Sequence, residues 1–317
     1  MESTGVYWIP LFQILEAKGI KVNLVNARHI KTVPGRKSDV LDCQWLQKLH
    51  TFGLLSASFR PEDQVCVLRS YIRQRGSLIK EAGTHIQRMQ KALIQMNLQL
   101  HQVISDISGV TGMAIIRQII KGERNPQKLA ALKDRRIKSS TEEITKALSG
   151  DYRAEHLFVL KQELTLYDTY QQQISELDIE IEQCLNNFES QTEKCPPEKK
   201  GKKRRKPPGN EPHFNLHQHL FRISGVDFTT IDGLNVLTVQ TILSEVGLDP
   251  CRFPTVKHFC SWLGLSPGSK ITGGKVKSSQ TRKVVNRAAN AFRLAAQSLK
   301  KSRSALGAFY RRLRGRL

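Results

Sequence analysis

Apolar residues recur at alternating spacings of three and four positions in two long central stretches of the chain. The first has them at positions 68, 72, 79, 82, 86, 89, 93, 96, 100 and 103, with a break only at Arg75, and the second has them at positions 157, 160, 164, 167, 174, 177, 181 and 185. This spacing predicts two long coiled-coil-like helices that pair as a hairpin or join partner chains. Gly109, Gly112, Gly122 and Pro126 lie between the stretches and predict short helices and turns.

The pattern at the start of the chain is of a different type. Residues 8–17 predict a helix ended by Gly19, the alternation of Val22, Leu24 and Val25 predicts a strand over residues 21–27, and a second helix begins near Ser38. A lone strand cannot satisfy its edges. The segment therefore borrows strands from a partner, or it is the rear part of a larger α/β domain whose front is absent, and we favour the second interpretation.

Residues 228–247 resemble a helix-hairpin-helix motif, with Gly233 and Asn235 at the hairpin and a helix over residues 236–246. The usual motif has a second glycine where Asn235 stands, and asparagine is the next-best residue at positive φ. The amides at the start of the following helix can bind a DNA phosphate.

A further helix near the C-terminus has two chemically different sides. Its apolar side consists of Val285, Ala288, Phe292, Ala295 and Leu299. Its polar side is suited to a phosphate backbone and consists of Arg282, Asn286, Arg287, Asn290 and Arg293.

Residues 262–283 have no periodicity and are predicted to form a loop. The segment interleaves glycines such as Gly273 and Gly274 with hydroxyl groups and with Lys270, Lys275 and Lys283. Glycine lets backbone amides approach a ligand closely, so amides and lysines together can form an anion site, and a hydroxyl inside such a site can bind a phosphate or attack it. The alternative is a basic loop that only faces solvent.

Charge is concentrated in two places. The net charge is +22, seven of the eight residues from 199 to 206 are basic, and the last 48 residues contain 14 Lys and Arg and no carboxylate. Clustered positive charge favours a nucleic-acid partner, with an anionic membrane as the weaker alternative. Residues 194–212, which include Lys202, Lys203, Arg204 and Arg205, are predicted to be a disordered linker that is either a tether or a contact to nucleic acid.

The first long helix has a basic outer face, which is either solvated or a second nucleic-acid surface. Its residues are Arg69, Arg73, Arg75, Lys80, Arg88 and Lys91. The six cysteines form no Cys-x-x-Cys pair, so free thiols in a reducing cytosol are expected. No apolar run approaches 18 residues and Glu2 stands where a signal peptide would be positive, so we expect a soluble, cytoplasmic, nucleoid-associated protein without a membrane partner.

Asp39 and Asp42 are three residues apart and share one face of the predicted helix that begins near Ser38. Two carboxylates on one face can hold a divalent metal together. Acidic residues are also common in the first turn of a helix, where they complement the helix dipole.

Four segments together resemble the DEDD-type transposases of the insertion sequence 110 family: MESTGVYW at residues 1–8, KSDVLDC at 37–43, LRSYIRQR at 68–75, and residues 262–275. The resemblance implies a RuvC-like, RNase H-fold domain, a coiled coil and a C-terminal transposase domain. It also implies DNA as substrate, dimers or tetramers, a structured noncoding guide RNA, and a serine nucleophile assisted by a Mg²⁺-binding acidic site.

Carried over to this chain, the acidic motif falls on Glu2, Asp39 and Asp42, and the family serine falls on Thr272 between Lys270 and Lys275. The first aspartate of the motif has no counterpart, which suggests an N-terminally shortened product. We expect a transposase that cuts and rejoins DNA. The alternatives are an impaired remnant that only binds nucleic acid and a structural coiled-coil nucleic-acid-binding protein unrelated to transposition.

The expected fold is mixed and mostly α. It comprises a partial RuvC-like α/β segment at residues 1–58, a helical coiled-coil region at 59–193, the linker at 194–212, and an all-α transposase domain with a helix-hairpin-helix-like element at 213–317.

Overall fold

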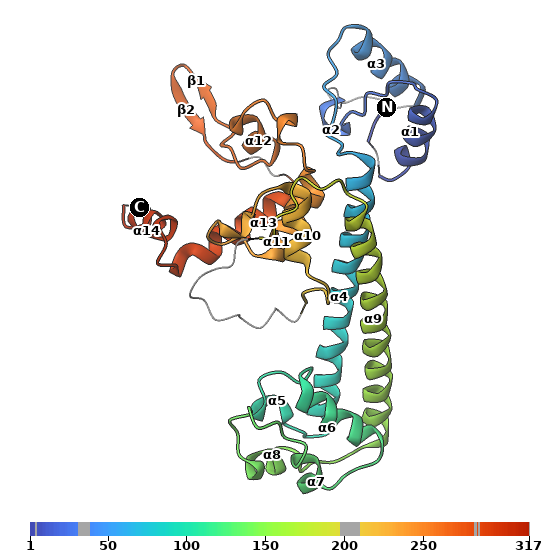
Figure 1. Ribbon diagram of the computed structural model, residues 1–317, viewed down its shortest axis with the longest axis vertical. Helices are drawn as coiled ribbons and strands as arrows, with labels where there is room; N and C mark the ends of the chain where they lie inside the picture. Colours follow the sequence, from blue (N-terminus) through green and yellow to red (C-terminus); the bar gives the residue numbers. More distant parts are fainter. Residues whose placement is uncertain (4, 31–38, 197–209, 282–283, 285, 317) are drawn as a thin grey trace. The chain divides into compact units, whose positions relative to one another are not determined.

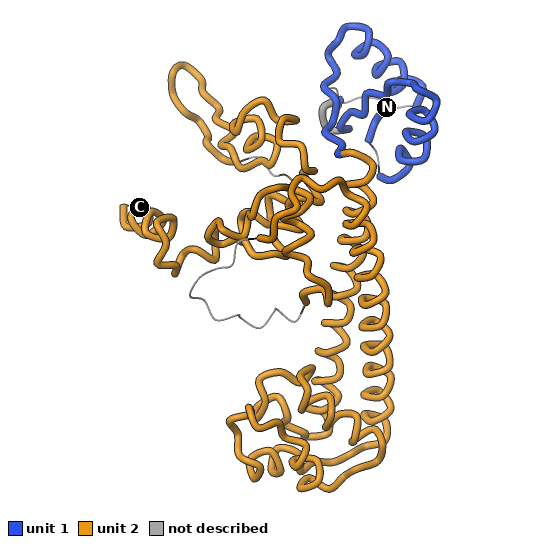
Figure 2. Tube along the Cα trace, viewed as in Figure 1, with its two compact units in different colours: residues 1–61 blue, residues 62–317 orange. Residues whose placement is uncertain are grey.

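The computed structural model describes residues 1–3, 5–30, 39–196, 210–281, 284 and 286–316. The chain divides into two compact units, residues 1–61 and 62–317 (Figure 2). The four basic linker residues Lys202, Lys203, Arg204 and Arg205 lie outside the described residues, as do Arg282 and Lys283. The domain boundaries within the second unit stay predictions.

The described part of the first unit contains three helices: α1 (Trp8–Ala17), α2 (Ala27–Ile30) and α3 (Asp39–Thr51) (Figure 1). The predicted helix over residues 8–17 is confirmed, and Gly19 follows it at φ +73°. Helix α3 begins where the second helix was expected.

The prediction of a strand over residues 21–27 is wrong. Among the described residues, the segment makes one isolated parallel bridge, between Glu2 and Val25, and α2 already begins at Ala27. Leu24 and Val25 are both buried, so successive side chains do not alternate between a covered and an open face as they would in a half-buried strand. Because the described part of this unit contains no regular strand, its RuvC-like fold stays a prediction.

Helices α4 (Asp63–Gln95) and α9 (Ala154–Asn186) lie side by side and antiparallel, which confirms a hairpin within the chain (Figure 1). Their interface follows a seven-residue repeat. The buried α4 residues of this repeat are Leu68, Arg75, Leu78, Ala82, His85, Met89 and Ala92. Ile79 and Ile86, predicted to lie in the interface, are only half-buried, because the repeat runs through Leu78 and His85 instead.

Two polar pairs lie within this apolar interface. Arg75 donates from Nε and Nη2 to the two carboxylate oxygens of Asp178 on α9, and both side chains are buried. His85 Nδ1 lies 2.5 Å from Glu163 Oε2, and its ring stacks on Tyr170. Arg75 is therefore an interface residue and neither a break in the pattern nor part of an exposed outer face. Polar pairs at such positions fix the alignment of two helices, because a slipped alignment would leave each partner buried alone.

Short helices close the far end of the hairpin, as predicted. They are α5 (Leu100–Val103), α6 (Val110–Ile120), α7 (Pro126–Ala130) and α8 (Thr141–Ala147). Pro126 occupies the first turn of α7 and Asn125 caps it, while Ser140 and Glu143 form a capping box at α8. These elements share a core with the adjacent halves of α4 and α9.

The outer face of α4 is basic only in part. Arg69 donates to the backbone oxygens of Ser244 and Glu245 at 2.9 and 3.0 Å, and Arg73 donates to both carboxylate oxygens of Glu245 at 2.9 and 2.7 Å. These two arginines therefore attach the C-terminal elements to the helical hairpin. The exposed remainder is Lys80, Arg88 and Lys91.

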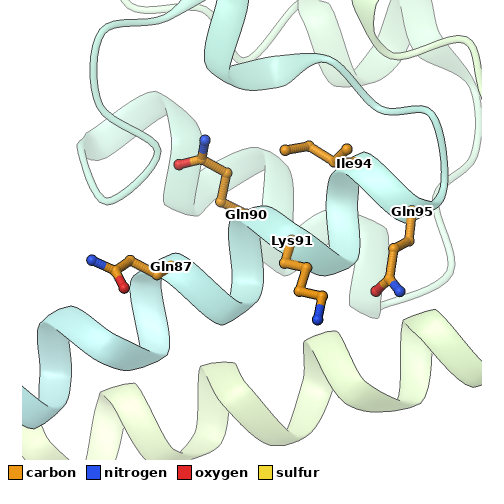
Figure 3. A pocket seen from close by; sticks show the side chains of 5 residues that line it. All are labelled: Gln87, Gln90, Lys91, Ile94 and Gln95. Atoms are coloured by element: carbon orange, nitrogen blue, oxygen red, sulfur yellow. The ribbon is translucent and has the colours of Figure 1, made fainter.

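Lys91 lines a pocket on α4 together with four neighbours from the same helix (Figure 3). These neighbours are Gln87, Gln90, Ile94 and Gln95.

The C-terminal elements are α10 (Leu216–Ser224), α11 (Val236–Val246), α12 (Val256–Trp262), strands β1 (Lys270–Thr272) and β2 (Lys275–Ser278), α13 (Arg287–Ser298) and α14 (Ala305–Arg314). Short 3-10 turns, η1 (Phe228–Thr230), η2 (Pro250–Arg252) and η3 (Leu299–Lys301), lie between them. The helix predicted over residues 236–246 is confirmed, whereas the expectation of an all-α domain is wrong because of the β1–β2 hairpin. No helix in the described ranges is both long and apolar enough to span a membrane.

Candidate functional site

The segment predicted as a loop over residues 262–283 contains an antiparallel hairpin. Gly273 and Gly274 form its two-residue turn at φ +56° and +73°, and positive φ at both positions is the signature of the type I′ turn that joins tightly paired strands. Thr272 pairs with Lys275, and Ile271 pairs with Val276. The loop prediction was wrong because it weighed the glycine and lysine content and overlooked the β-branched residues on both sides of a Gly-Gly pair.

The base of the hairpin is held by the surrounding fold. Pro267 and Thr281 form an antiparallel bridge, and Gly268 N donates to Gln280 O at 2.9 Å. Just before this base, Leu263 at the end of α12 is 1% exposed and packs in a cluster with Ala288 and Ala289 of α13. The hairpin thus projects from a small core shared by the helices on either side of it (Figure 1).

Thr272 and Lys275 lie directly opposite each other, so their side chains share one face of the hairpin. Both are exposed, and a Cβ added to Gly273 or Gly274 would meet no atom within 4 Å. A ligand can therefore reach the turn backbone without steric obstruction. Lys270 of β1, which pairs with Ser278, adds a second positive charge to that of Lys275 on β2. The tip combines a hydroxyl, cationic side chains and accessible backbone, which is the chemistry of an anion site.

Helix α13 carries the predicted division between an apolar and a basic side. Ala288, Ala289 and Ala295 are buried, while Arg287 and Arg293 are exposed. Asn286 caps the helix by accepting a hydrogen bond from Ala289 N at 3.2 Å. The exposed arginines therefore stay available for a phosphate backbone, and their role in binding nucleic acid stays a prediction.

Sequence reasoning missed α14. Two features of the sequence indicate this helix: Ser304 is a suitable N-cap, and the spacing of Leu306, Phe309 and Leu313 places them on one side. Arg311, Arg312 and Arg314 lie in its last turn, where positive charge complements the helix dipole.

The two hairpin residues of the helix-hairpin-helix-like element have structural partners. Gly233 has φ +90°, and a Cβ there would lie 2.8 Å from Ala295 O, so glycine permits the close approach of α11 and α13. Asn235 does not adopt positive φ. It is extended at φ −103° and caps α11, since its side chain accepts from Thr238 N at 2.8 Å. The expectation for the Asn235 backbone is therefore wrong, because N-capping satisfies its side chain in the extended conformation.

The three predicted metal ligands all lie in the first unit. Asp39 and Asp42 are exposed in the first turn of α3, and Glu2 is half-buried at the bridge to Val25. Among the described residues, no three His, Cys, Asp or Glu side chains come close enough to hold a metal ion together. The structure therefore gives the two aspartates the position that complements a helix dipole and does not gather all three carboxylates.

A buried polar cluster at the start of the C-terminal region was also missed. Asp227 Oδ1 lies 2.9 Å from His217 Nε2, and accepts from Thr229 N at 3.0 Å and from Thr229 Oγ1 at 2.7 Å. Burial acts to raise the pKa of Asp227, but the hydrogen bonds from Thr229 and His217 outweigh it and hold this pKa below its ordinary value. The cluster joins α10 to η1. Its sequence signal is the Asp-x-Thr pattern of a capping turn.

Comparison with protein families gives two matches. Residues 1–98 match a model for transposases of the DEDD type from IS110 elements, and residues 227–311 match the model described as the transposase IS116/IS110/IS902 family. The second match includes α11, the β1–β2 hairpin and α13, and together the two span more than half of the 317 residues. A search of curated proteins finds no match. The chain belongs to the IS110 family of insertion-sequence transposases, proteins of DNA transposition and recombination.

Proposed function

We propose that this chain is a DNA recombinase whose C-terminal elements bind duplex DNA and present the Thr272 hydroxyl to a phosphodiester. The observation that carries the proposal is the tip of the hairpin, where Thr272 lies directly opposite Lys275 beside the open glycine turn. Family membership supplies the reaction class. The tip supplies a nucleophile together with groups that bind anions.

In the proposed step, Thr272 Oγ forms a bond to phosphorus while the bond from phosphorus to one deoxyribose oxygen breaks. The threonine proton leaves to solvent, and the departing deoxyribose oxygen takes a proton from solvent. Lys275 and the amides of Gly273 and Gly274 stabilise charge on the phosphoryl oxygens during the attack. Attack by a deoxyribose hydroxyl of another strand on the same phosphorus releases Thr272 and rejoins the DNA.

Threonine has the same nucleophilic oxygen as serine, but its extra methyl group restricts χ1. The methyl also crowds an in-line approach to phosphorus, so a correctly placed threonine reacts more slowly than serine. This chemical difference makes Thr272→Ser an informative variant.

Mg²⁺ is the metal that carboxylate ligands of this type would hold. Glu2, Asp39 and Asp42 do not fit the ion as they stand, because they do not gather in the described residues. We therefore derive no step through a metal. A noncoding guide RNA and a homo-oligomer, both implied by the sequence resemblance, are included in the proposal as partners. The exposed arginines of α13 and α14 offer such an RNA the same kind of surface as they offer DNA.

A second candidate function is nucleic-acid binding without strand transfer. Two observations favour it, namely the threonine at the nucleophile position and the carboxylates that do not gather. The hypothesis of a structural coiled-coil protein unrelated to transposases does not agree with the family membership.

The experiment that tests the proposal measures a covalent protein–DNA adduct on a denaturing gel, with an end-labelled pool of mixed-sequence duplexes. We expect Thr272→Ser to raise the amount of adduct and Thr272→Ala to abolish it. Ser279→Ala, which removes a hydroxyl just beyond β2, is the matched control and should leave the adduct unchanged.

Equal amounts of adduct in wild type and Thr272→Ala would exclude Thr272 as the nucleophile. No adduct in any variant, with DNA binding retained, would establish the second candidate function.

A further inference from the structure

The β1–β2 hairpin has two faces of opposite character. Thr272 and Lys275 form a polar face, whereas Ile271 and Val276 form a directly opposed apolar pair on the other side. The two apolar side chains are 63% and 62% exposed. Neither belongs to a hydrophobic core cluster of the described residues.

An isolated two-stranded hairpin is at best marginally stable in water, and this one has exposed residues along both strands. β-branched side chains suit the strands, but threonine would suit them as well without exposing apolar surface. The secondary structure of the hairpin alone therefore does not explain why Ile271 and Val276 are apolar.

The positive charge of the hairpin indicates which kind of partner could cover the apolar pair. Lys270, Lys275 and Lys277 lie on the same two short strands as the apolar pair. The sequence from residue 270 to the C-terminus contains no carboxylate. This combination favours a polyanion that also offers apolar surface. Duplex DNA does so at its base faces, which apolar side chains reach when they insert between base steps.

We propose that the hairpin enters duplex DNA and that Ile271 and Val276 act as a wedge that unstacks bases beside the phosphate facing Thr272. The inference rests on the proposed function and extends it, because it assigns the second face of the hairpin to DNA deformation. Unstacking kinks the duplex and so changes the orientation of the neighbouring phosphate. An in-line approach by the Thr272 hydroxyl depends on that orientation.

The first test uses the full chain and a fluorescein-labelled duplex of mixed sequence, with affinity measured by anisotropy over a range of salt concentrations. The variant carries Ile271→Thr and Val276→Thr, which keep the β-branched shape. Because the lost contact is apolar, we expect about tenfold weaker binding with an unchanged slope of log affinity against log salt. Lys277→Gln should instead lower the steepness of that slope by about 0.9.

The second test detects unstacking directly. Closed-circular plasmid is relaxed by topoisomerase I in the presence of the protein, and the DNA is then deproteinised. Wild type should leave a negative shift in linking number, and the double threonine variant should leave none at concentrations that give equal occupancy. Ile271→Val combined with Val276→Ile keeps the apolar pair and should behave as wild type.

Other results would overturn the inference. Unchanged affinity and unchanged linking number in the double threonine variant would place the hairpin outside the DNA while the proposed DNA binding stands. An altered salt slope with persistent unwinding would show a contact to phosphates alone. Failure of the wild type to bind the duplex, or its binding only to phosphatidylserine vesicles, would overturn the proposed function itself.

Discussion

The buried Arg75–Asp178 pair offers a quantitative test of how the helical hairpin is aligned. The Arg75 and Asp178 side chains are 7% and 6% exposed, so solvent screens their interaction little. Arg75 Nη1 also donates to Asn210 O at 2.8 Å. Replacing Arg75 by methionine keeps much of its volume and leaves the Asp178 carboxylate buried without its partner.

We expect Arg75→Met to destabilise the second unit by about 3–5 kcal/mol, the usual cost of breaking a buried pair. At roughly 2–4 °C per kcal/mol for a unit of this size, the melting temperature should fall by roughly 6–20 °C. The double variant Arg75→Met with Asp178→Leu removes both charges. It should recover most of the lost stability, because an apolar replacement of a buried pair is often neutral or better.

The assay is thermal unfolding followed by circular dichroism at 222 nm, which reports mainly on the helices. Lys80→Met is the matched control, because Lys80 is an exposed residue of the same helix. Its effect should stay within about 0.5 kcal/mol. Two results would refute this account: Arg75→Met melting like Lys80→Met, or the double variant being as unstable as the single variant.

Two further predictions concern titration and metal. Because the pKa of Asp227 is lowered in the folded protein, its contribution to stability is fully present above the ordinary value of 3.8 and is lost as the pH falls below it. In Asp227→Asn, the free energy of unfolding should therefore fall less steeply as the pH is lowered below 3.8, as measured by circular dichroism. The same pH dependence in wild type and variant would contradict this. Mg²⁺ at about 1 mM should not raise the melting temperature. A site with so few carboxylate oxygens does not compensate the ion for losing its bound water. A rise that disappears in Asp39→Ala would show that the acidic site is complete, for instance in an oligomer.

The sequence allowed some elements to be predicted because their determinants are local. The helices over residues 8–17 and 236–246 have apolar periodicity together with a terminating glycine or a capping side chain. The alignment of α4 with α9 could not be predicted in the same way. It depends on Arg75 and His85, polar residues whose partners lie 103 and 78 positions away in the chain. Pattern analysis treats such residues as interruptions, since it cannot see their partners.

In the candidate site, too, the residue types could be predicted from the sequence, whereas their conformations could not. Its composition identified Thr272, Lys275 and the glycines, but the pairing that puts Thr272 opposite Lys275 arises from the turn geometry. Asn235 was assigned a backbone role on the basis of its tolerance of positive φ, whereas its side chain satisfies a helix N-terminus. In both cases the residue type was informative and its conformation depended on a hydrogen bond that the pattern does not specify.

The basic residues of α4 show why charge alone does not locate a nucleic-acid surface. Arg69 and Arg73 use their guanidinium groups to bind the C-terminal end of α11 and the Glu245 carboxylate, whose side chain is 9% exposed. An arginine that already makes such bonds would have to give them up to bind a phosphate, and Glu245 would be left buried and unpaired. Among the described residues, Arg287 and Arg293 of α13 make no ion pair with a carboxylate, and Arg311 of α14 donates to the backbone oxygens of Lys300 and Ser302. We therefore expect DNA affinity to depend on the C-terminal arginines and the hairpin lysines, and the arginines of α4 to act through the placement of the domain that carries them.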